Sequence, residues 1–467
     1  MTAGAEPLSV RDPATGEVIA DDVAAASSGD VDRAVAAARA AFDDGRWTGQ
    51  GGMERARVLW RIADLIEAQT ERLASVEVRD NGMSVAAARH LVRLGAETFR
   101  YFAGWCTHIA GLAPDVDRPG RPLLAYTIRE PVGVAALIIP WNTPFSSACT
   151  KLATALAAGC STVLKPAEET PLTALLLTAL CRDAGLPRGV VNLVNGRGPE
   201  AGAALAAHPD VDKIAFTGST AVGREIVRAA AGNLKKVTLE LGGKSPVIVL
   251  PDADLEAAIP GLALGAFMNS GQACIAGSKI LVHRSRYAEV ADKLAAYAAE
   301  MRLGDGFDPA TELGPLISER QLERVLALIA CGRRDGAELL AGGGRRDRPG
   351  FFVEPTVMTA PALGSDILRE EIFGPVATLL PFVEEEEAVT FGNATEYGLS
   401  AAVWTRDIKA AHRLARRLRA GTVWLNCQMV TDRRMPFGGY KQSGWGRENG
   451  AEGIDAYLQT KSVFAAL

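Results

Sequence analysis

Hydrophobic and polar positions follow two different periods along the chain. In the first hundred residues the apolar positions recur at helical spacing, as in Val58, Leu59, Ile62 and Leu65. Such spacing predicts amphipathic helices. We read this whole region as helical, with one helix that has Asp30 as its N-cap, one over 53–78 and one over 85–105.

From Gly133 the pattern changes to short β-rich runs separated by helical stretches. The runs cover residues 134–139, 162–165, 190–194, 213–216 and 236–239. Continuous apolar strands that alternate with helices predict a doubly wound parallel sheet. Because ligands of such sheets bind beyond the carboxyl ends of the strands, the residues that follow each run are candidates for a site.

A second α/β alternation begins after Gly242 and continues to about residue 445, with strands expected over 246–250 and 279–283 and helices after Asp254 and over 288–301. Between the first helices and the first sheet, Gly111–Glu130 contains prolines and a β-like run, which predicts a hairpin. The tail, 455–464, is expected to supply another strand. The length of 467 residues is consistent with two or three domains.

Composition narrows the class of protein. Hydrophobic residues make up 48% and charged residues 22%, and the net charge is −5, values typical of globular proteins. No block of five Lys or Arg occurs, so nucleic acid is not an expected partner. The N-terminus lacks the features of a signal peptide and the apolar stretches are too short to span a bilayer, so no membrane association is expected.

Seven cysteines are scattered through the chain without a C-x-x-C pair. This pattern favours neither a disulfide framework nor a zinc site, and it fits a reducing cytoplasm. Cys274 lies among small residues in 269–277, which would leave its thiol accessible. A thiol needs a local depression of its pKa to act as a nucleophile; on this segment alone, a buried structural cysteine is the alternative.

Two further polar residues end predicted strands. Glu240 lies between apolar residues and is followed by two glycines; burial would raise its pKa toward that of a useful general base, and a surface glutamate is the alternative. Asn142, in Pro140-Trp-Asn, could donate its amide to a developing oxyanion, or be a turn residue. Phe216–Gly223 follows a strand and opens a helix, where backbone N–H groups can approach a diphosphate. The near-match over 196–202 misses G-x-G-x-x-G by one residue, and we interpret it as a turn near the adenine side.

Taken together, these segments make the chain resemble the aldehyde dehydrogenase superfamily over essentially its whole length. The motifs that carry the resemblance are PWN at 140–142, KPAE at 165–168, FTGS at 216–219, ELGGKSP at 240–246, GQAC at 271–274, EEIFGPV at 370–376 and PFGGYKQSG at 436–444. Their order, and the separation of 34 residues between 240 and 274, also match the family.

The resemblance implies a role for each matched residue. Cys274 is the expected nucleophile, Glu240 the general base and Asn142 the oxyanion donor together with the backbone N–H of Cys274; Lys151 and Glu448 match a pair that relays protons to the base. Cofactor contacts are expected from Trp141, Lys165, Glu168, Gly218, Ser219, Gly223, Gln321, Glu371 and Phe373. No metal is expected.

The resemblance also implies a reaction and an architecture. An aldehyde would be oxidised to a carboxylate through a thiohemiacetal and a thioester on Cys274, with NAD as cofactor and NADP possible. The implied fold is aldehyde dehydrogenase-like α/β: a cofactor-binding domain with a doubly wound parallel sheet (1–110 and 131–242), an α/β catalytic domain (243–445) and a small β oligomerisation unit (111–130 and 446–467). A homodimer or homotetramer is expected, because the hairpin would expose an unpaired edge in a monomer.

Three other functions compete with this one. A CoA-acylating semialdehyde dehydrogenase shares the fold but typically lacks the base, here Glu240. A non-catalytic protein on the same fold would tend to lose the thiol or the base, and both are present. A generic Rossmann alcohol dehydrogenase is disfavoured because the chain has no zinc-ligand set and no Tyr-x-x-x-Lys in a suitable place.

The substrate itself is constrained only by side chains expected around a tunnel. Thr143, Ser146, Ser147 and Thr150 share one helical face. Met429 and Thr431 are expected opposite, near Phe437, and Ala273 and Ile275 flank the thiol. Small hydroxylated groups predict a wide, polar tunnel and a bulky or polar aldehyde. Arg433 and Arg434 could meet a substrate carboxylate or be solvated surface charges.

Overall fold

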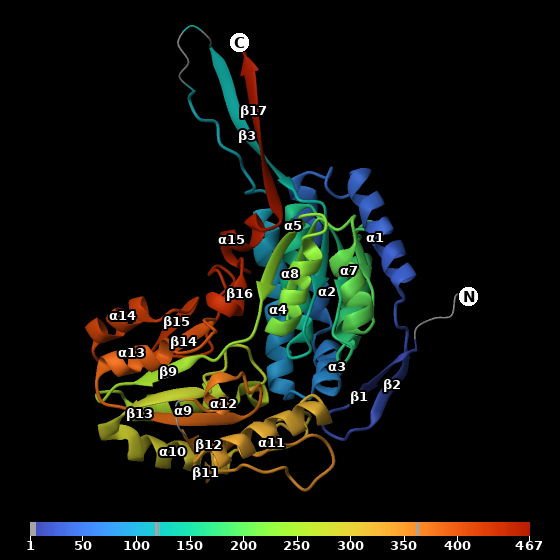
Figure 1. Cartoon of the computed structure of the whole chain (residues 1–467). Helices are drawn as coiled ribbons and strands as arrows, with labels where there is room; N and C mark the ends of the chain where they lie inside the picture. The colour runs from blue at the N-terminus through green and yellow to red at the C-terminus, as the bar shows by residue number, and fades with distance from the viewer. Residues whose placement is uncertain (1–5, 117–119, 121, 361–363) are drawn as a thin grey trace.

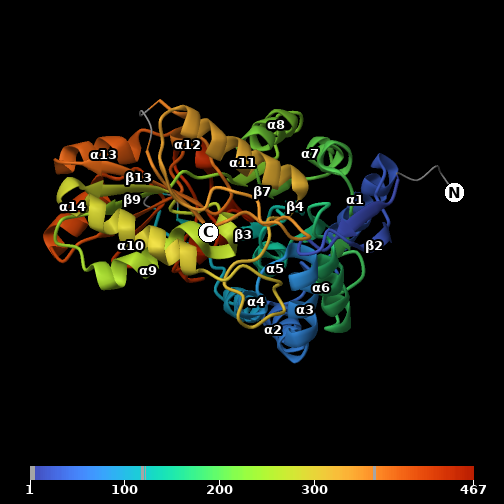
Figure 2. The same ribbon diagram turned by 90° about the horizontal axis from the view of Figure 1, so that it is seen from below.

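The chain forms two parallel β-sheets, each covered by helices on both faces, and a two-stranded arm that projects from them (Figure 1). This is the mixed α/β fold expected from the sequence. The structure is a computed structural model that describes residues 6–116, 120, 122–360 and 364–467. Figure 2 shows the two helix-covered sheets side by side from below.

The first sheet has the strand order β16-β8-β7-β4-β5-β6. Its strands are β4 (Val134–Ile138), β5 (Ser161–Lys165), β6 (Val191–Leu193), β7 (Lys213–Thr217), β8 (Lys236–Glu240) and β16 (Gly444–Trp445). The five strands from β4 to β8 are parallel, and each bound lies within one residue of the predicted run. β16 pairs antiparallel with β8, with Gly444 opposite Glu240.

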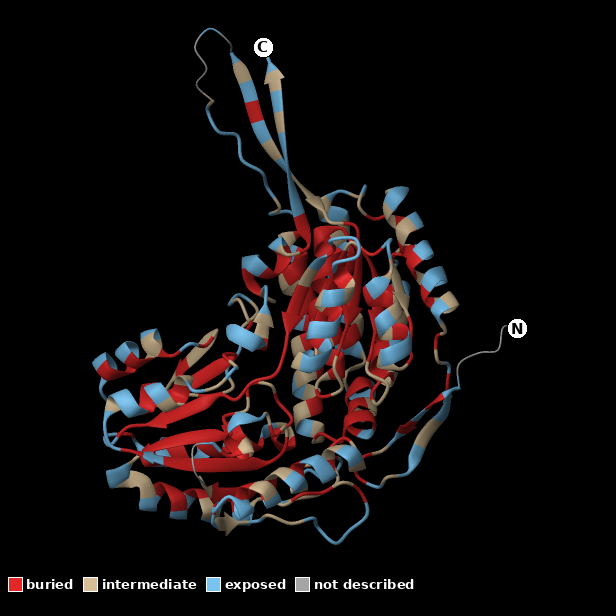
Figure 3. Ribbon diagram, in the orientation of Figure 1, coloured by how far each residue is buried: buried red, intermediate tan, exposed pale blue. Residues whose placement is uncertain are grey.

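Alternate side chains of the central strand β4 enter two separate cores. Val134, Ala136 and Ile138 pack with α1, α7 and α8 on one face, whereas Ala135 and Leu137 pack with α2, α4, α5 and α6 on the other. These helices are α1 (Ser28–Asp43), α2 (Gly52–Ala68), α3 (Thr70–Asn81), α4 (Val85–Trp105), α5 (Pro144–Ala158), α6 (Leu172–Asp183), α7 (Ala203–Ala207) and α8 (Thr220–Ala230). Burial on both faces explains why the strands read as continuous apolar runs (Figure 3).

The second sheet has the order β11-β12-β13-β10-β9-β14-β15, and β11 alone in it runs antiparallel to its neighbour. Its strands are β9 (Pro246–Val249), β10 (Lys279–His283), β11 (Leu339–Ala341), β12 (Thr356–Thr359), β13 (Val376–Phe382), β14 (Ser400–Trp404) and β15 (Thr422–Leu425). Its helices are α9 (Leu255–Phe267), α10 (Tyr287–Glu300), α11 (Glu319–Arg334), α12 (Asp366–Arg369), α13 (Glu385–Asn393) and α14 (Ile408–Arg417).

Three predictions for the N-terminal region are wrong. The chain begins with an antiparallel pair, β1 (Leu8–Arg11) and β2 (Val18–Val23), in a region that we read as helical. The N-cap of α1 is Ser27, and Asp30 is instead the third residue of a reciprocal capping box with it. The helix expected over 53–78 is two helices, α2 and α3, which meet at Gln69.

The hairpin predicted over 111–130 includes residues 117–119 and 121, which lie outside the described part of the chain. Its described residues fold back where the N–H of Thr127 donates to the carbonyl of Leu112 at 2.8 Å. Its strand β3 (Leu123–Pro131) pairs antiparallel over its whole length with β17 (Leu458–Ala466), the strand expected from the tail. The short helix α15 (Gly450–Asp455) precedes β17. Among the described residues, no helix is long and apolar enough to cross a bilayer.

Candidate active site

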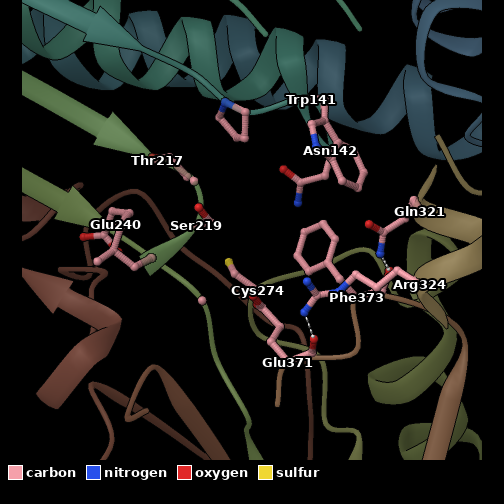
Figure 4. Close-up of a pocket in the computed structure, with 14 residues that line it drawn as sticks. Trp141, Asn142, Thr217, Ser219, Glu240, Cys274, Gln321, Arg324, Glu371 and Phe373 are labelled. Carbon is pink, nitrogen blue, oxygen red and sulfur yellow. Dashed lines mark hydrogen bonds between the residues drawn. The ribbon is translucent and has the colours of Figure 1, made fainter. Parts of the chain in front are cut away.

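A cavity of about 220 Å³ opens where the carboxyl ends of three strands of the first sheet face loops of the second. Its lining residues are Pro140, Trp141, Asn142, Thr217, Gly218, Ser219, Glu240, Leu241, Gly242, Cys274, Gln321, Arg324, Glu371 and Phe373. The first nine follow or end β4, β7 and β8, as expected for a parallel sheet. In Figure 4, Asn142 and Cys274 face the same space, with Glu240 on one side and Phe373 on the other.

Cys274 lies in the loop between α9 and β10, where the backbone is tightly constrained. Asn269 and Ser270 adopt left-handed conformations (φ 51° and 57°). A Cβ on Gly271 would lie 2.0 Å from the carbonyl oxygen of Gly374, and one on Gly243 would lie 2.2 Å from that of Cys274. Only glycine fits at these two positions, and the close packing fixes the thiol in the cavity wall.

The surroundings of Cys274 oppose its ionisation. The thiol is half-buried. Burial raises its pKa, and the nearby carboxylates of Glu371 and Glu240 raise it further. The cavity by itself therefore disfavours the thiolate, so a nucleophilic role needs a base that takes the thiol proton.

Glu240 ends β8 and is buried, with neither carboxylate oxygen hydrogen-bonded. Burial raises its pKa well above the usual range and Glu448 adds to the effect, whereas Lys151 and Arg447 oppose it. A Cβ at Gly438 would lie 2.7 Å from Oε1 of Glu240, so the glycine leaves room for the carboxyl group. A carboxyl with a raised pKa and free oxygens has the properties of a general base.

Asn142 is held at the end of β4 by bonds to the loop that carries Cys274. Its Nδ2 donates to the carbonyl of Gln272 at 2.9 Å, and its own carbonyl accepts from Nδ2 of Asn269 at 2.9 Å. A carboxamide has two N–H groups, and one of them makes this bond. The second is available for a group bound in the cavity.

Lys151 and Glu448 form an ion pair behind the cavity wall. The side chain of Lys151, on α5, is 1% exposed, and Glu448 is held by backbone bonds to Phe437. Neither residue lines the cavity, but both affect the pKa of Glu240. The pair therefore lies within electrostatic reach of that carboxyl.

At the opposite end of the cavity, Glu371 and Phe373 lie in the loop before β13. Oε1 of Glu371 accepts from the N–H of Gly243 at 3.0 Å, and burial raises its pKa to about 7. Phe373 packs edge-on against Trp141, with 5.1 Å between ring centroids. Gln321, on α11, donates to the carbonyl of Phe373 at 2.8 Å and so holds this loop.

The start of α8 forms a third part of the cavity wall. Ser219 is the N-cap, and its hydroxyl accepts from the N–H of Val222. At Gly218 a Cβ would lie 2.4 Å from the ring of Phe216, so a side chain there would be excluded. Gly223 lies outside this cavity; it faces Leu241 and lines a neighbouring hollow between α8 and β16.

Lys165 and Glu168, which follow β5, also lie outside the residues that line the cavity. Lys165 is buried and donates to the carbonyl of Pro166 at 3.0 Å. Its Nζ is 3.7 Å from Oε2 of Glu168, and burial lowers its pKa. Oε1 of Glu168 is 3.5 Å from the N–H of Gly198, at the turn that we expect near the adenine side.

Sequence reasoning missed Arg324, which lines the cavity one helical turn after Gln321. Its Nη2 donates to the carbonyl of Glu371 at 3.0 Å. The only signal was the i, i+3 spacing on α11, which puts both side chains on one face. Pro140, Thr217, Leu241 and Gly242 also line the cavity; they lie within the quoted motifs, but no role was predicted for them.

The two arginines considered as substrate contacts differ in their surroundings. Arg434 is exposed and paired with Asp432. Arg433 is half-buried against α5, with Nη2 3.4 Å from Oγ of Ser146 and Nη1 3.4 Å from Oδ1 of Asn449, and its Nε is buried without a partner. Neither arginine lines the cavity that holds Cys274.

Within the described ranges, no group of three His, Cys, Asp or Glu side chains is placed to share a metal ion. The residues that line the cavity include a thiol, two carboxyl groups, two carboxamides, a guanidinium and two hydroxyls.

The family model of the aldehyde dehydrogenase family matches residues 1–463. The chain belongs to the aldehyde dehydrogenase family. It is 48% identical over 97% of its length to a mitochondrial aldehyde dehydrogenase of Equus caballus, covering 90% of that protein. It is 45% identical over its full length to a mitochondrial benzaldehyde dehydrogenase of Antirrhinum majus, covering 87% of it. Among solved structures, the NAD⁺ complex of an aldehyde dehydrogenase from Bacillus cereus matches with a TM-score of 0.96 and 48% identity, over 98% of this chain and 93% of that one.

Proposed function

We propose that this member of the family oxidises an aldehyde to a carboxylate with NAD, using Cys274 as nucleophile, Glu240 as general base and Asn142 as oxyanion donor. One observation supports this most directly: three segments far apart in the sequence bring a thiol, a free carboxyl and an amide to the wall of one cavity. The order of the motifs along the sequence does not by itself show that these three side chains lie close together.

In the first step the Cys274 thiol gives its proton to the Glu240 carboxylate, directly or through water, and the resulting thiolate adds to the aldehyde carbon. The second N–H of the Asn142 carboxamide is positioned to donate to the oxygen that becomes negative, and its bond to Gln272 fixes its orientation. A donor that is already oriented stabilises the developing charge without reorganisation. Loss of hydride from the resulting thiohemiacetal would leave a thioester on Cys274.

The second step is hydrolysis of that thioester. Glu240 takes a proton from water, because its oxygens are unpaired and its surroundings raise its pKa. The Lys151–Glu448 ion pair behind it gives the proton a route away from Glu240. Covalent catalysis thereby divides one difficult reaction into two easier ones.

We infer that NAD binds across this cavity and the surface next to it, and four groups of residues support the inference. The backbone at Gly218 and Ser219 begins α8, where N–H groups suit a diphosphate. Oε2 of Glu371 faces Gly242, and a Cβ on that glycine would lie 2.5 Å from this oxygen. The oxygen can accept hydrogen bonds from ribose hydroxyls. Lys165 and Glu168, outside the cavity, would hold the other ribose. Trp141, Phe373 and Gln321 would shape the remaining cavity wall, and Gly223 would contact the cofactor from the neighbouring hollow. NAD, when bound, supplies the hydride acceptor.

The assembly and location predicted from the sequence remain part of the proposal. The arm formed by β3 and β17 has exposed apolar side chains, including Leu124 at 47% and Phe464 at 66% exposure. An isolated two-stranded ribbon is marginally stable in water, so we infer that a second subunit covers it. All seven cysteines are free. The cytoplasmic location remains a prediction from their scatter along the sequence. The three-domain division likewise remains a prediction.

Two variants test the proposed chemistry. Cys274→Ala should abolish NADH formation from an aldehyde panel, whereas Glu240→Gln should accumulate an acyl-enzyme that intact-protein mass spectrometry detects as added mass on Cys274. Cys427→Ala, at another half-buried thiol, is the matched control and should retain activity. Full activity in Cys274→Ala would refute the proposal. Formation of an acyl-CoA when CoA is added would instead favour the acylating alternative.

A further inference from the structure

The C-terminal turn of α3 contacts the segment that carries the oxyanion donor. Asn81, the last residue of α3, is 1% exposed, and its Nδ2 donates to the carbonyl of Trp141 at 2.7 Å and lies 3.3 Å from that of Asn142. These two carbonyls belong to the turn between β4 and α5. A helix from elsewhere in the fold therefore holds the backbone from which the Asn142 amide projects.

Glu77 lies one helical turn before Asn81, on the same face of α3. It is fully buried, and its Oε1 accepts from the N–H of Phe145 at 3.2 Å. Phe145 is the second residue of α5, and the N-cap of that helix, Thr143, makes no capping bond with its side chain. Glu77 thus supplies the cap that Thr143 does not, and it fixes the start of α5 directly after Asn142.

The same turn of α3 also contacts the loops of the second sheet. Gly82, in the left-handed conformation (φ 86°), ends the helix, and a Cβ there would lie 2.7 Å from Cγ of Pro315. The carbonyl of Pro315 lies 3.5 Å from Nε2 of Gln272, whose own carbonyl accepts from Asn142. The turn therefore touches both sides of the oxyanion site, the Asn142 side and the Cys274 side.

We propose that Asn81 and Glu77 are positioning residues that set the direction of the Asn142 amide toward the carbonyl oxygen of the substrate. Neither lines the cavity, so they act through Asn142 and not on the substrate. This inference rests on the proposed role of Asn142 as oxyanion donor. Two other groups lie within electrostatic reach of Glu77: the carboxyl of Asp80 on its own helix and the thiol of Cys149 on α5. Burial raises the pKa of both groups, and Glu77 raises it further.

Two reactions of Cys274 separate positioning from general damage. Acylation by p-nitrophenyl acetate passes through an oxyanion, whereas alkylation by iodoacetamide does not; neither needs NAD. Asn81→Ala should slow acylation about 10- to 100-fold, part of the loss expected when an oxyanion donor is removed. Alkylation of Cys274, followed by peptide mass spectrometry, should change little. Equal losses in both reactions, or none, would overturn the proposal.

A matched control and a double variant sharpen the test. Asn192 donates to the carbonyls of Thr162 and Gly189 at the far edge of the first sheet, so Asn192→Ala removes the same type of bond away from the site and should leave acylation unchanged. If Asn81 acts through Asn142, the double variant Asn81→Ala/Asn142→Ala should be no slower than Asn142→Ala. Additive losses would show that Asn81 acts by another route.

Glu77 gives an independent test if Asn81→Ala does not fold. Glu77→Gln keeps an acceptor oxygen for the Phe145 N–H and should retain most of the acylation rate, whereas Glu77→Leu removes it and should lose acylation selectively. Equal rates in the two variants would contradict the proposal. If Asn142→Ala itself leaves acylation intact, the assignment of the oxyanion donor fails, and not merely its positioning.

Discussion

Glu240 is a buried acid that must lose its proton to work as a base. Its raised pKa comes first from burial and then from Glu448, and no hydrogen bond stabilises its charged form. The same environment that makes it a strong base therefore makes its charge unfavourable to the folded state. Catalysis and stability respond to its ionisation in opposite directions.

This conflict predicts a pH-dependent difference in stability. The folded protein raises the pKa of Glu240 above the ordinary value of 4.5. The contribution of protonated Glu240 to the free energy of unfolding is therefore fully present below pH 4.5 and is lost as pH rises toward the pKa in the folded protein. Glu240→Gln should therefore gain melting temperature relative to the wild type between pH 5 and pH 8, as measured by calorimetry. Over the same range the wild-type deacylation rate should rise. A constant difference in melting temperature would contradict the burial argument. Glu370→Gln, at an exposed carboxylate, is the control.

Glu168 is the residue expected to select the cofactor. A carboxylate accepts from two ribose hydroxyls and repels a 2′-phosphate, so we expect a higher kcat/KM with NAD than with NADP. Glu168→Ser should narrow this ratio, mainly through the KM for NADP. Glu169→Ser is a control next to it, since Glu169 pairs with Arg320 instead. Equal kcat/KM for the two cofactors in the wild type would refute the assignment.

At the scale of the element, α5 joins the oxyanion site to the expected aldehyde tunnel. Its N-terminal face has Thr143 and Ser147 in contact through their hydroxyls at 3.1 Å, and Ser146 in contact with Arg433. No aromatic side chain occupies these positions, so the face is small and polar. We expect a bulky or polar aldehyde to be oxidised with a higher kcat/KM than acetaldehyde.

Kinetics with acetaldehyde, benzaldehyde and a dicarboxylic semialdehyde would test this expectation, and the highest kcat/KM with acetaldehyde would contradict it. The two arginines give a matched pair for the third substrate. Arg433→Ala should raise the KM for the semialdehyde if its half-buried guanidinium meets the carboxylate. Arg434→Ala, which breaks only a surface ion pair with Asp432, should change little. Equal KM values for the semialdehyde in both variants would show that Arg433 does not contact the substrate carboxylate.

Sequence patterns predicted the elements whose periodicity is set by burial, such as β4 to β8 and α4. They failed where a local hydrogen bond or a distant partner decides the structure. The break at Gln69 has no proline or glycine beside it; the hydroxyl of Thr70 instead bonds back to the carbonyl of Glu67 at 2.9 Å and competes with the helix. β3 has an obvious strand pattern, but its partner β17 lies more than 300 residues later in the chain.

For the proposed site, too, the sequence predicted residues that have a local signature and missed residues whose role depends on a distant contact. Motifs predicted Cys274, Glu240 and Asn142 because each has a distinctive local context: Glu240 ends β8, Asn142 follows β4, and Cys274 lies in a loop of small residues. Arg324, Asn81 and Glu77 lie in ordinary helical patterns, and their roles depend on which carbonyl or N–H each side chain meets. Such contacts are set by tertiary packing and have no signature in the local sequence.

At the scale of the whole molecule, the arm of β3 and β17 extends away from both sheets (Figure 1). Its exposed apolar residues Leu124 and Phe464 are unfavourable in a monomer. Replacing both with Lys should shift the protein from a dimer or tetramer toward the monomer in light scattering coupled to gel filtration. Lys461→Ala, which removes only a surface ion pair on the same arm, should not. A monomeric wild type would contradict the proposed assembly.

The pairing of β16 with β8 has a consequence for synthesis of the chain. β16 pairs with β8 beside Glu240, and Glu448 lies behind the Glu240 carboxyl. Both β16 and Glu448 leave the ribosome about 200 residues after Glu240. A nascent chain therefore displays Cys274 long before its base is enclosed. Chains released early carry an accessible thiol in an unfinished wall, open to water and to oxidants. Under the proposed mechanism, turnover needs the last tenth of the chain to complete the first sheet, so premature termination should yield inactive protein instead of a partly active one.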